Sequence, residues 1–213
     1  MKARRSGSRS ASKGRIVEAA LDTLDRLGYA RSTARAIAET GGFNQALIYY
    51  HFESLEDLLI AALQEFSERR MERYRAALDG ELTMTSLMET MTRLYREDAQ
   101  SGRLAAAQEV VAASSSSPEL GQRVIEIMGP WLAFAEEVVL RMLDGTIFGE
   151  IVPAKELAYA LVALYFGVET LARLDRDRAQ TQALFESGAR LAPLVDAVLH
   201  ADIQLGDDQP RAE

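Results

Sequence analysis

The segment from Thr33 to Phe52 constrains the fold more than any other part of the chain. Its residues are typical of two short helices separated by a glycine turn, with Ala38 small enough to let the helices cross closely. Gly42, four residues further on, can adopt the positive φ that a sharp turn requires. Ile48 is spaced to point back from the second helix and close the crossing. This pattern predicts a helix-turn-helix, a unit that presents its second helix to the major groove of DNA.

Apolar residues follow helical spacing along the rest of the chain, and no segment alternates as a strand would. We therefore expect an all-α protein with an N-terminal three-helix helix-turn-helix DNA-binding domain and a larger helical domain. Four parts are predicted: a disordered basic arm (1–12), the helix-turn-helix domain (13–53), the helical body (54–205, with 54–78 as a linking helix) and a disordered tail (206–213). Helices are expected over 12–27, 33–40, 44–51, 54–78, 83–101, 104–113, 118–143, 153–174 and 181–200.

Several of these helices carry recognisable capping signals. Ser32 or Thr33 can cap the second helix, and Asn44 can cap the third. Ser54 and Asp57 have the spacing of a capping box, although Asp replaces the usual Glu or Gln. Ser117 followed by Pro118 supplies a cap and a first-turn proline for a later helix.

The net charge of −8 is distributed unevenly along the chain. Residues 1–15 contain six basic residues and no acidic one, residues 1–60 carry +2, and the remaining 153 residues carry −10. A positive head on an acidic body would present one end to DNA phosphates. An acidic protein with a basic tail has the same distribution, so the charge supports DNA binding only together with the helix-turn-helix.

Composition argues against several other classes. Cysteine is absent, which excludes disulfides and predicts a cytoplasmic protein, and no apolar run reaches the roughly 18 residues of a membrane span. The two histidines form no catalytic or metal-binding pattern, and Glu97-Asp98 and Glu136-Glu137 are expected to be solvated charges. We therefore expect neither an enzyme nor a cofactor, a metal or a membrane partner.

The last two long helices suggest dimerisation. Residues 157–168 form an uncharged run that is apolar nearly all round, as suits a helix buried on two sides. Small residues recur at helical spacing and would allow two helices from each of two chains to pack closely. The alternative is a helix that is central within one monomer. The predicted interface residues are Ala160, Ala163, Gly167, Leu171, Gly188, Leu191, Ala192 and Val195.

Four segments resemble the TetR family of bacterial transcriptional repressors. The likeness runs through Ser32-Thr-Ala-Arg-Ala-Ile-Ala38, Gly42-Phe-Asn44, Ile48-Tyr-Tyr-His-Phe52 and Leu58-Leu59, and it covers about 50 residues. Beyond them only the length and the helical character match. The resemblance implies a homodimer that binds a palindromic operator on double-stranded DNA and responds to a small-molecule effector bound in the body.

Carried over by position, the resemblance also implies individual DNA contacts. Thr33 and Tyr49 would bind phosphates, while Arg35 and Gln45 have the chemistry to read base edges. Arg35 could instead form only a surface ion pair. Leu47 could contact a thymine methyl, Tyr50 could reach phosphate or sugar, and Asn44 and Ala46 complete the predicted DNA-binding set. Ile37, Ala38, Phe43, Ile48 and Phe52 are expected to be core, and His51 is expected to pack or to cap.

Two positions depart from the family pattern. Leu55 and Gln45 stand where relatives often have lysine, which removes phosphate contacts. The arm could compensate by following the DNA backbone or entering a minor groove. A solvated tail has the same composition. The arm residues concerned are Arg4, Arg5, Arg9, Lys13 and Arg15.

Methionine and aromatic side chains in the body suggest a soft pocket for an apolar or aromatic effector. Glu169, in a mostly apolar helix, could meet a cation or a polar group. Ordinary core packing explains the same residues, and a DNA-binding protein without effector control is the rival function. The candidate pocket residues are Met88, Met91, Tyr95, Met128, Trp131, Phe134, Tyr165, Phe166 and Glu169.

Overall fold

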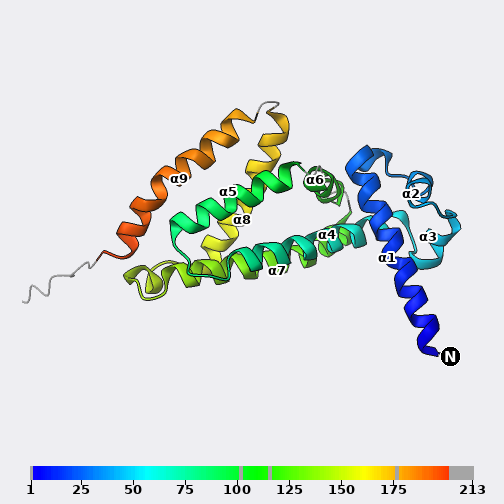
Figure 1. Cartoon of the computed structure of the whole chain (residues 1–213), viewed down its shortest axis with the longest axis horizontal. Helices are drawn as coiled ribbons and strands as arrows, with labels where there is room; N and C mark the ends of the chain where they lie inside the picture. The colour runs from blue at the N-terminus through cyan, green and yellow to red at the C-terminus, as the bar shows by residue number, and fades with distance from the viewer. Residues whose placement is uncertain (1, 101–102, 115–116, 176–177, 202–213) are drawn as a thin grey trace, which may run out of the picture.

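The computed structural model describes residues 2–100, 103–114, 117–175 and 178–201, and every regular element within these ranges is a helix. The predicted all-α class is confirmed. The elements α1–α3 form a head at one end of the molecule, and α4 leads from it into the body alongside α7 (Figure 1). The elements are α1 (Lys2–Leu27), η1 (Tyr29–Arg31), α2 (Ala34–Gly41), α3 (Ala46–His51), α4 (Leu55–Ala77), α5 (Met84–Gln100), α6 (Arg103–Ser114), α7 (Pro118–Leu143), η2 (Ile147–Glu150), α8 (Ala154–Leu174) and α9 (Ala179–Leu199).

Helix α1 differs from expectation at its start. It begins at Lys2, so the segment predicted as a disordered arm is helical over residues 2–12, and its first turns project beyond the head (Figure 1). The segment contains no proline, and extending an existing helix costs far less than nucleating a new one. At the other end, Gly28 with φ 74° terminates α1 as predicted. The tail predicted over 206–213 lies outside the described residues.

The predicted caps form. Thr33 Oγ1 accepts a hydrogen bond from Ala36 N at 3.2 Å, and Ser54 and Asp57 make the reciprocal bonds of a capping box. Ser117 Oγ accepts from Leu120 N. Helix α3 starts two residues later than predicted, yet Asn44 Oδ1 still accepts from Ala46 N at 2.8 Å. Short-range hydrogen bonds therefore fix where these helices begin.

One apolar core joins the head to the body. Ile37 and Ile48 of the head are fully buried, and residues from α4, α6 and α7 belong to the same cluster. Packing is thus continuous across residue 53, the boundary that the sequence suggests between two domains. A second cluster, farther from the head, contains Met71, Tyr74, Leu78, Leu94, Phe134 and Val138 from α4, α5 and α7.

Helices α8 and α9 leave a broad apolar surface uncovered. Helix α8 packs on α7 and α9 packs on α5, so each turns its other side outward. By length and composition α8 could also cross a membrane, contrary to the expectation that no segment could, and only 17% of its apolar window is buried. We call this surface the α8–α9 face; its large exposed members are Leu157, Tyr159, Leu161, Leu164, Leu171, Leu174, Leu184, Leu191, Leu194, Val195 and Val198.

Candidate DNA-binding surface and effector site

The turn between α2 and α3 has the geometry that its glycines allow. Gly42 adopts φ 63° and ends α2, while Ile48 and Ala38 are buried beneath the crossing. Gly41, which the sequence analysis did not single out, is also required for this turn. A Cβ placed there would lie 2.1 Å from Phe43 Cε1 and 2.8 Å from Ala19 Cβ, so only glycine fits where α2 approaches α1.

The surface of α3 is unusually rich in exposed aromatic side chains. Tyr49 is 53% exposed and Tyr50 is 63% exposed, although Ile48 beside them is fully buried. Gln45 and Ala46 are exposed as well, at the start of the same helix. Leu47 differs from the expectation, because it is half-buried and packs against the core of the head. Two rings and one amide therefore face outward from the helix proposed to enter the groove.

Arg35 forms a surface ion pair in this structure. Its Nε lies 2.8 Å from Glu39 Oε1, one helical turn along α2, and this contact raises the pKa of the guanidinium. Arg35 and Glu39 border an open hollow that Asn44 and Gln45 close on the α3 side. Because both partners are largely exposed, the pair is weak and can be exchanged for a contact to DNA.

The middle of α1 is attached to the end of α3. Ser12 Oγ lies 2.8 Å from His51 Nε2, and the ammonium of Lys13 sits 5.4 Å from the centre of the Phe52 ring. His51 is half-buried, which agrees with the packing function predicted for it. Arg15 is exposed on the same helix. The side chains of Arg4, Arg5 and Arg9 lie outside the described part of the chain.

The body contains a buried polar cluster made of Arg70 and Tyr74 from α4, Asp98 from α5, and Tyr165 and Glu169 from α8. Arg70 Nε binds Asp98 Oδ2 at 2.5 Å, and its Nη2 donates to Tyr165 Oη. Tyr74 Oη donates to Asp98 Oδ2 at 3.1 Å. Asp98 is only 2% exposed, so the expectation that it is a solvated charge is wrong.

Aromatic rings surround the guanidinium of Arg70. The rings of Tyr74, Trp131 and Tyr165 have their centres 5.0 to 5.2 Å from its central carbon, within the range of a cation–π interaction. Burial raises the pKa of the Tyr165 hydroxyl and that of Tyr74. Both rings therefore act as neutral hydrogen-bonding groups. The sequence reading missed Arg70, because 28 residues separate it from Asp98.

Glu169 is the least satisfied member of this cluster. Its Oε2 accepts from Gln108 Nε2 at 3.0 Å, whereas its Oε1 is buried without a hydrogen-bond partner, 3.7 Å from Arg70 Nη2. The side chain is 4% exposed, and burial raises its pKa to about 7, against the opposing charge of Arg70. Gln108 therefore holds one oxygen of this carboxyl group, while the other has the longer ion pair with Arg70.

Only some of the predicted pocket residues lie together. Tyr165 contacts Tyr95, edge to face with ring centres 6.4 Å apart, close to Glu169. Met91, Trp131 and Phe134 belong to the second apolar cluster, next to Tyr74. Met88 instead packs towards Gly188, Met128 packs against the core that joins head and body, and Phe166 is half-buried on α8.

The predicted interface residues divide into two groups. Ala160, Ala163, Gly167 and Leu171 are exposed on α8, and Leu191 and Val195 are exposed on α9. Ala192 is 1% exposed, and a Cβ at Gly188 would lie 2.5 Å from Met88 Cε. These two positions face α5 of the same chain, so assigning them to an interface between chains is wrong.

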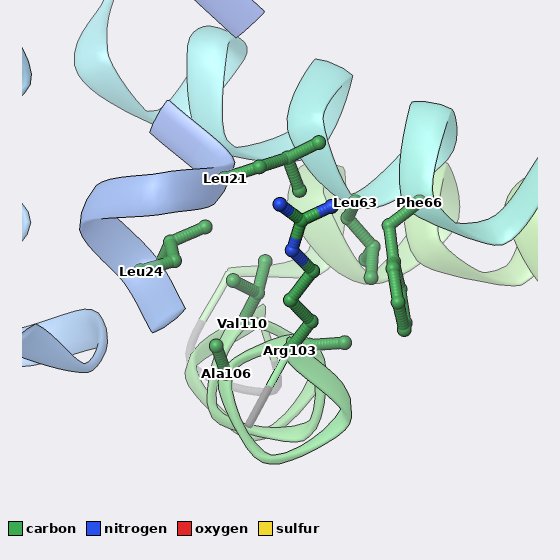
Figure 2. Close-up of a pocket in the computed structure, with 8 residues that line it drawn as sticks. Leu21, Leu24, Leu63, Phe66, Arg103, Ala106 and Val110 are labelled. Carbon is green, nitrogen blue, oxygen red and sulfur yellow. The ribbon is translucent and has the colours of Figure 1, made fainter. Parts of the chain in front are cut away.

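No group of three or more His, Cys, Asp or Glu side chains within the described ranges is arranged to hold a metal ion. A small apolar cavity of about 10 Å³ lies where α1, α4 and α6 meet, lined partly by Leu24, Phe66 and Val110 (Figure 2). Head and body are therefore closely packed at this junction.

Comparison with known proteins agrees with this geometry. The model of the family of bacterial regulatory proteins, tetR family, matches residues 16–69. The chain is 26% identical over 179 residues to the HTH-type transcriptional regulator UidR of Escherichia coli K12, covering 83% of this chain and 88% of UidR.

Solved structures of low identity share the fold. Salmonella enterica GusR aligns with a TM-score of 0.67 at 21% identity, over 89% of this chain and 95% of its own. FadR of Bacillus subtilis, solved with stearoyl-CoA, aligns with a TM-score of 0.64 at 20% identity, over 84% of this chain and 96% of its own. The glycine turn, the outward-facing α3 and the match over residues 16–69 identify the head as a DNA-binding helix-turn-helix domain of the tetR family of bacterial regulatory proteins, and the chain as a transcriptional regulator and not an enzyme.

Proposed function

We propose that this regulator is a homodimeric, cytoplasmic repressor that binds a palindromic operator and leaves it when a small molecule binds in the body. The observation that carries the DNA-binding part is the exposure of Tyr49 and Tyr50, which directly follow the buried Ile48 on α3. A helix with no DNA to meet would gain little from two exposed rings. Thr33, Arg35, Asn44 and Gln45 are exposed on the same head and would supply polar contacts.

Dimerisation through the α8–α9 face would cover the large apolar surface that a monomer leaves in water. The small side chains of Ala160, Ala163 and Gly167 lie on this exposed side of α8 and allow a second helix to approach closely. A two-fold dimer would place its two heads on half-sites about 34–36 Å apart, as a palindrome requires. The same coverage explains the apolar character of α8 without a membrane.

The effector is proposed to bind beside the polar cluster, between Tyr95, Trp131 and Glu169. Its aromatic walls favour an apolar or aromatic body, and the orphaned Glu169 Oε1 favours a hydrogen-bond donor or a cation on that body. This combines the apolar or aromatic effector expected from the sequence with the polar contact expected at Glu169. The division into a DNA-binding head (13–53) and a sensing body (54–205) is part of the same proposal.

The first experiment is selection of binding sites from a random duplex library with the purified protein. Enrichment of a palindrome is expected, and it would supply the operator for effector screens by DNA release. Binding without enrichment that falls uniformly as salt rises would contradict sequence-specific recognition and indicate phosphate binding alone.

The dimer is tested separately with Ala163→Glu, which places a charge in the proposed interface. The variant is expected to have half the wild-type mass in light scattering, because burying the unpaired carboxylates is costly. Ala30→Glu, an exposed position on η1, is the matched control and should leave the mass unchanged. An Ala163→Glu protein that remains a dimer would place the interface elsewhere.

A DNA-binding protein without effector control is the second candidate. It is favoured by the close packing of the candidate pocket, where Tyr95 stacks on Phe185 with ring centres 4.8 Å apart and Met91 packs into the second apolar cluster. An effector would have to displace these contacts. A library of aromatic amines and hydroxylated aromatics, screened for release from the selected operator, separates the two candidates.

A further inference from the structure

The body is connected to the head by two routes. Helix α4 continues the chain out of the head, while α6, which is remote in sequence, lies against the end of α1 without any covalent link (Figures 1 and 2). Arg103 of α6 binds Asp22 of α1, with Nη2 and Oδ1 3.0 Å apart. The cavity of about 10 Å³ at this junction is too small to decouple the helices.

Glu109 on α6 makes the most direct contact of this second route. Its Oε2 accepts a hydrogen bond from the backbone N–H of Tyr29 at 2.6 Å, where the chain leaves α1 and enters η1. A Cβ on Gly28 would lie 3.1 Å from the same oxygen, so glycine leaves room for the carboxylate as well as adopting φ 74°. One carboxylate oxygen is therefore committed to the backbone of the head.

The second oxygen of Glu109 is held by the body. Arg173 of α8 donates from Nη2 to Glu109 Oε1 at 2.9 Å and from Nη1 to the carbonyl of Ala105 at 3.1 Å. The neighbouring residue, Gln108, donates to Glu169 in the buried polar cluster. Two consecutive residues of α6 thus contact α8, and one of them also contacts the head.

We propose that Glu109 is a positioning residue that couples the placement of α8 to the placement of the head, through the relay Arg173–Glu109–Tyr29. The proposal rests on the proposed function, in which α8 forms the dimer interface and the spacing of the two heads decides operator binding. A shift of α8 relative to α6 would then move both heads, because the carboxylate binds a backbone N–H. Release of DNA does not have to pass through α4 alone.

The absence of cysteine from the chain makes the relay accessible to distance measurement. Asp25→Cys on the exposed side of α1 provides one spin label per head, and double electron–electron resonance then gives the distance between the heads of the dimer. Arg173→Met removes the α8 end of the relay but leaves the Glu109–Tyr29 bond. We expect a broader distance distribution and about tenfold weaker binding to the selected operator, a size typical of coupling between sites.

Three further variants separate positioning from stability. Arg173→Lys retains the charge towards Glu109 and should restore part of the narrow distribution. In Glu109→Gln the side-chain NH₂ replaces one of the two accepting oxygens and therefore faces either Tyr29 N–H or Arg173, both of which are donors. This variant should act like Arg173→Met. Arg75→Met removes the 3.1 Å ion pair between Arg75 and Glu137, an interhelical pair within the body, and should change neither distance nor operator preference.

Each outcome is decisive. Wild-type distances and affinity in folded, dimeric Arg173→Met and Glu109→Gln proteins would overturn the relay while leaving the proposed function intact. Equal broadening in the Arg75→Met control would also overturn it, since any lost ion pair would then suffice. A wild-type protein that gives no distance between heads, or selects no operator, would refute the dimeric repressor and the relay with it.

Discussion

In the head, the polar side chains proposed to bind DNA stand outside an apolar core, whereas in the body the most densely hydrogen-bonded polar groups are buried. Tyr49 and Arg35 are exposed, and their contacts within the chain are few or weak. Arg70 and Asp98 are enclosed and bind each other directly. Substitutions on the head surface should therefore change DNA binding and spare stability, while substitutions in the polar cluster should change stability first.

Asp98→Ala should have the largest effect on stability. Removing this carboxylate leaves the buried Arg70 guanidinium without its closest carboxylate and with only the longer contact to Glu169, and breaking a buried ion pair typically costs about 3–5 kcal/mol. Urea denaturation followed by circular dichroism measures the change in the free energy of unfolding. The double variant Arg70→Met with Asp98→Leu removes both charges and should be markedly more stable than Asp98→Ala. Equal losses in the two proteins would indicate that packing, and not the unpaired charge, dominates.

Glu169→Gln tests the same cluster through pH. The pKa of Glu169 is about 7 in the fold against 4.5 for a free carboxyl, so the folded state binds more protons between these values. Its contribution to stability is complete below pH 4.5 and is lost as pH rises through 7. Arg70, Asp98, Tyr165 and Tyr95 are the charged and titratable groups around it.

The variant stays neutral, so its stability relative to the wild type should rise by about 3 kcal/mol from pH 4.5 to pH 7. Chemical denaturation at a series of pH values measures this. Glu89→Gln, on the exposed side of α5, is the control whose carboxylate stays in water. A constant difference between Glu169→Gln and the wild type across this range would show that Glu169 is already ionised in the fold.

Arg35→Ala should act on recognition without affecting folding. If Arg35 reads a guanine, its loss should reduce discrimination at that base by about tenfold and leave other positions unchanged. The selected operator and its single-base variants, compared in fluorescence anisotropy, give the measurement. Glu39→Gln, which frees Arg35 from its ion pair, is the matched variant and should not relax specificity. Unchanged discrimination between bases in Arg35→Ala would show that Arg35 forms only a surface ion pair and does not contact a base.

Tyr49→Phe should have the smallest effect, about a threefold loss of affinity that is equal for every DNA sequence, because one hydroxyl contact to a phosphate is removed. Titration of operator and random duplexes at one salt concentration distinguishes this from base reading. A loss confined to the operator would mean that Tyr49 contacts a base instead.

The two regions also differed in how well the sequence predicted them. Thr33, Gly42 and the capping box at Ser54 act over three or four residues, so their spacing alone predicted the head. Helix boundaries in the body could be predicted for the same reason, as Ser117 and Pro118 illustrate. The extension of α1 to Lys2 could not be predicted, because a helix that simply continues shows no cap or periodic pattern in its sequence.

The sites in the body depend on contacts between distant segments. Arg70 and Asp98 are 28 residues apart, and Glu109 is 80 residues from Tyr29, so no local spacing marks them. Gly188 and Ala192 fitted a small-residue stripe, but the structure uses them to bring α9 close to α5 within one chain. Small residues indicate close helix packing without indicating which helix approaches.

The apolar core shared by head and body limits how this regulator can be re-engineered. A chimera that joins residues 1–53 to the body of another family member would strip Leu21 and Leu24 of α1 of the neighbours that α6 supplies, Ala106 and Val110 among them. A transplant of DNA specificity should therefore exchange surface residues of α2 and α3 and keep the native scaffold beneath them. The head has its own surface for DNA, but it shares its apolar core with the body and is not an independent folding unit.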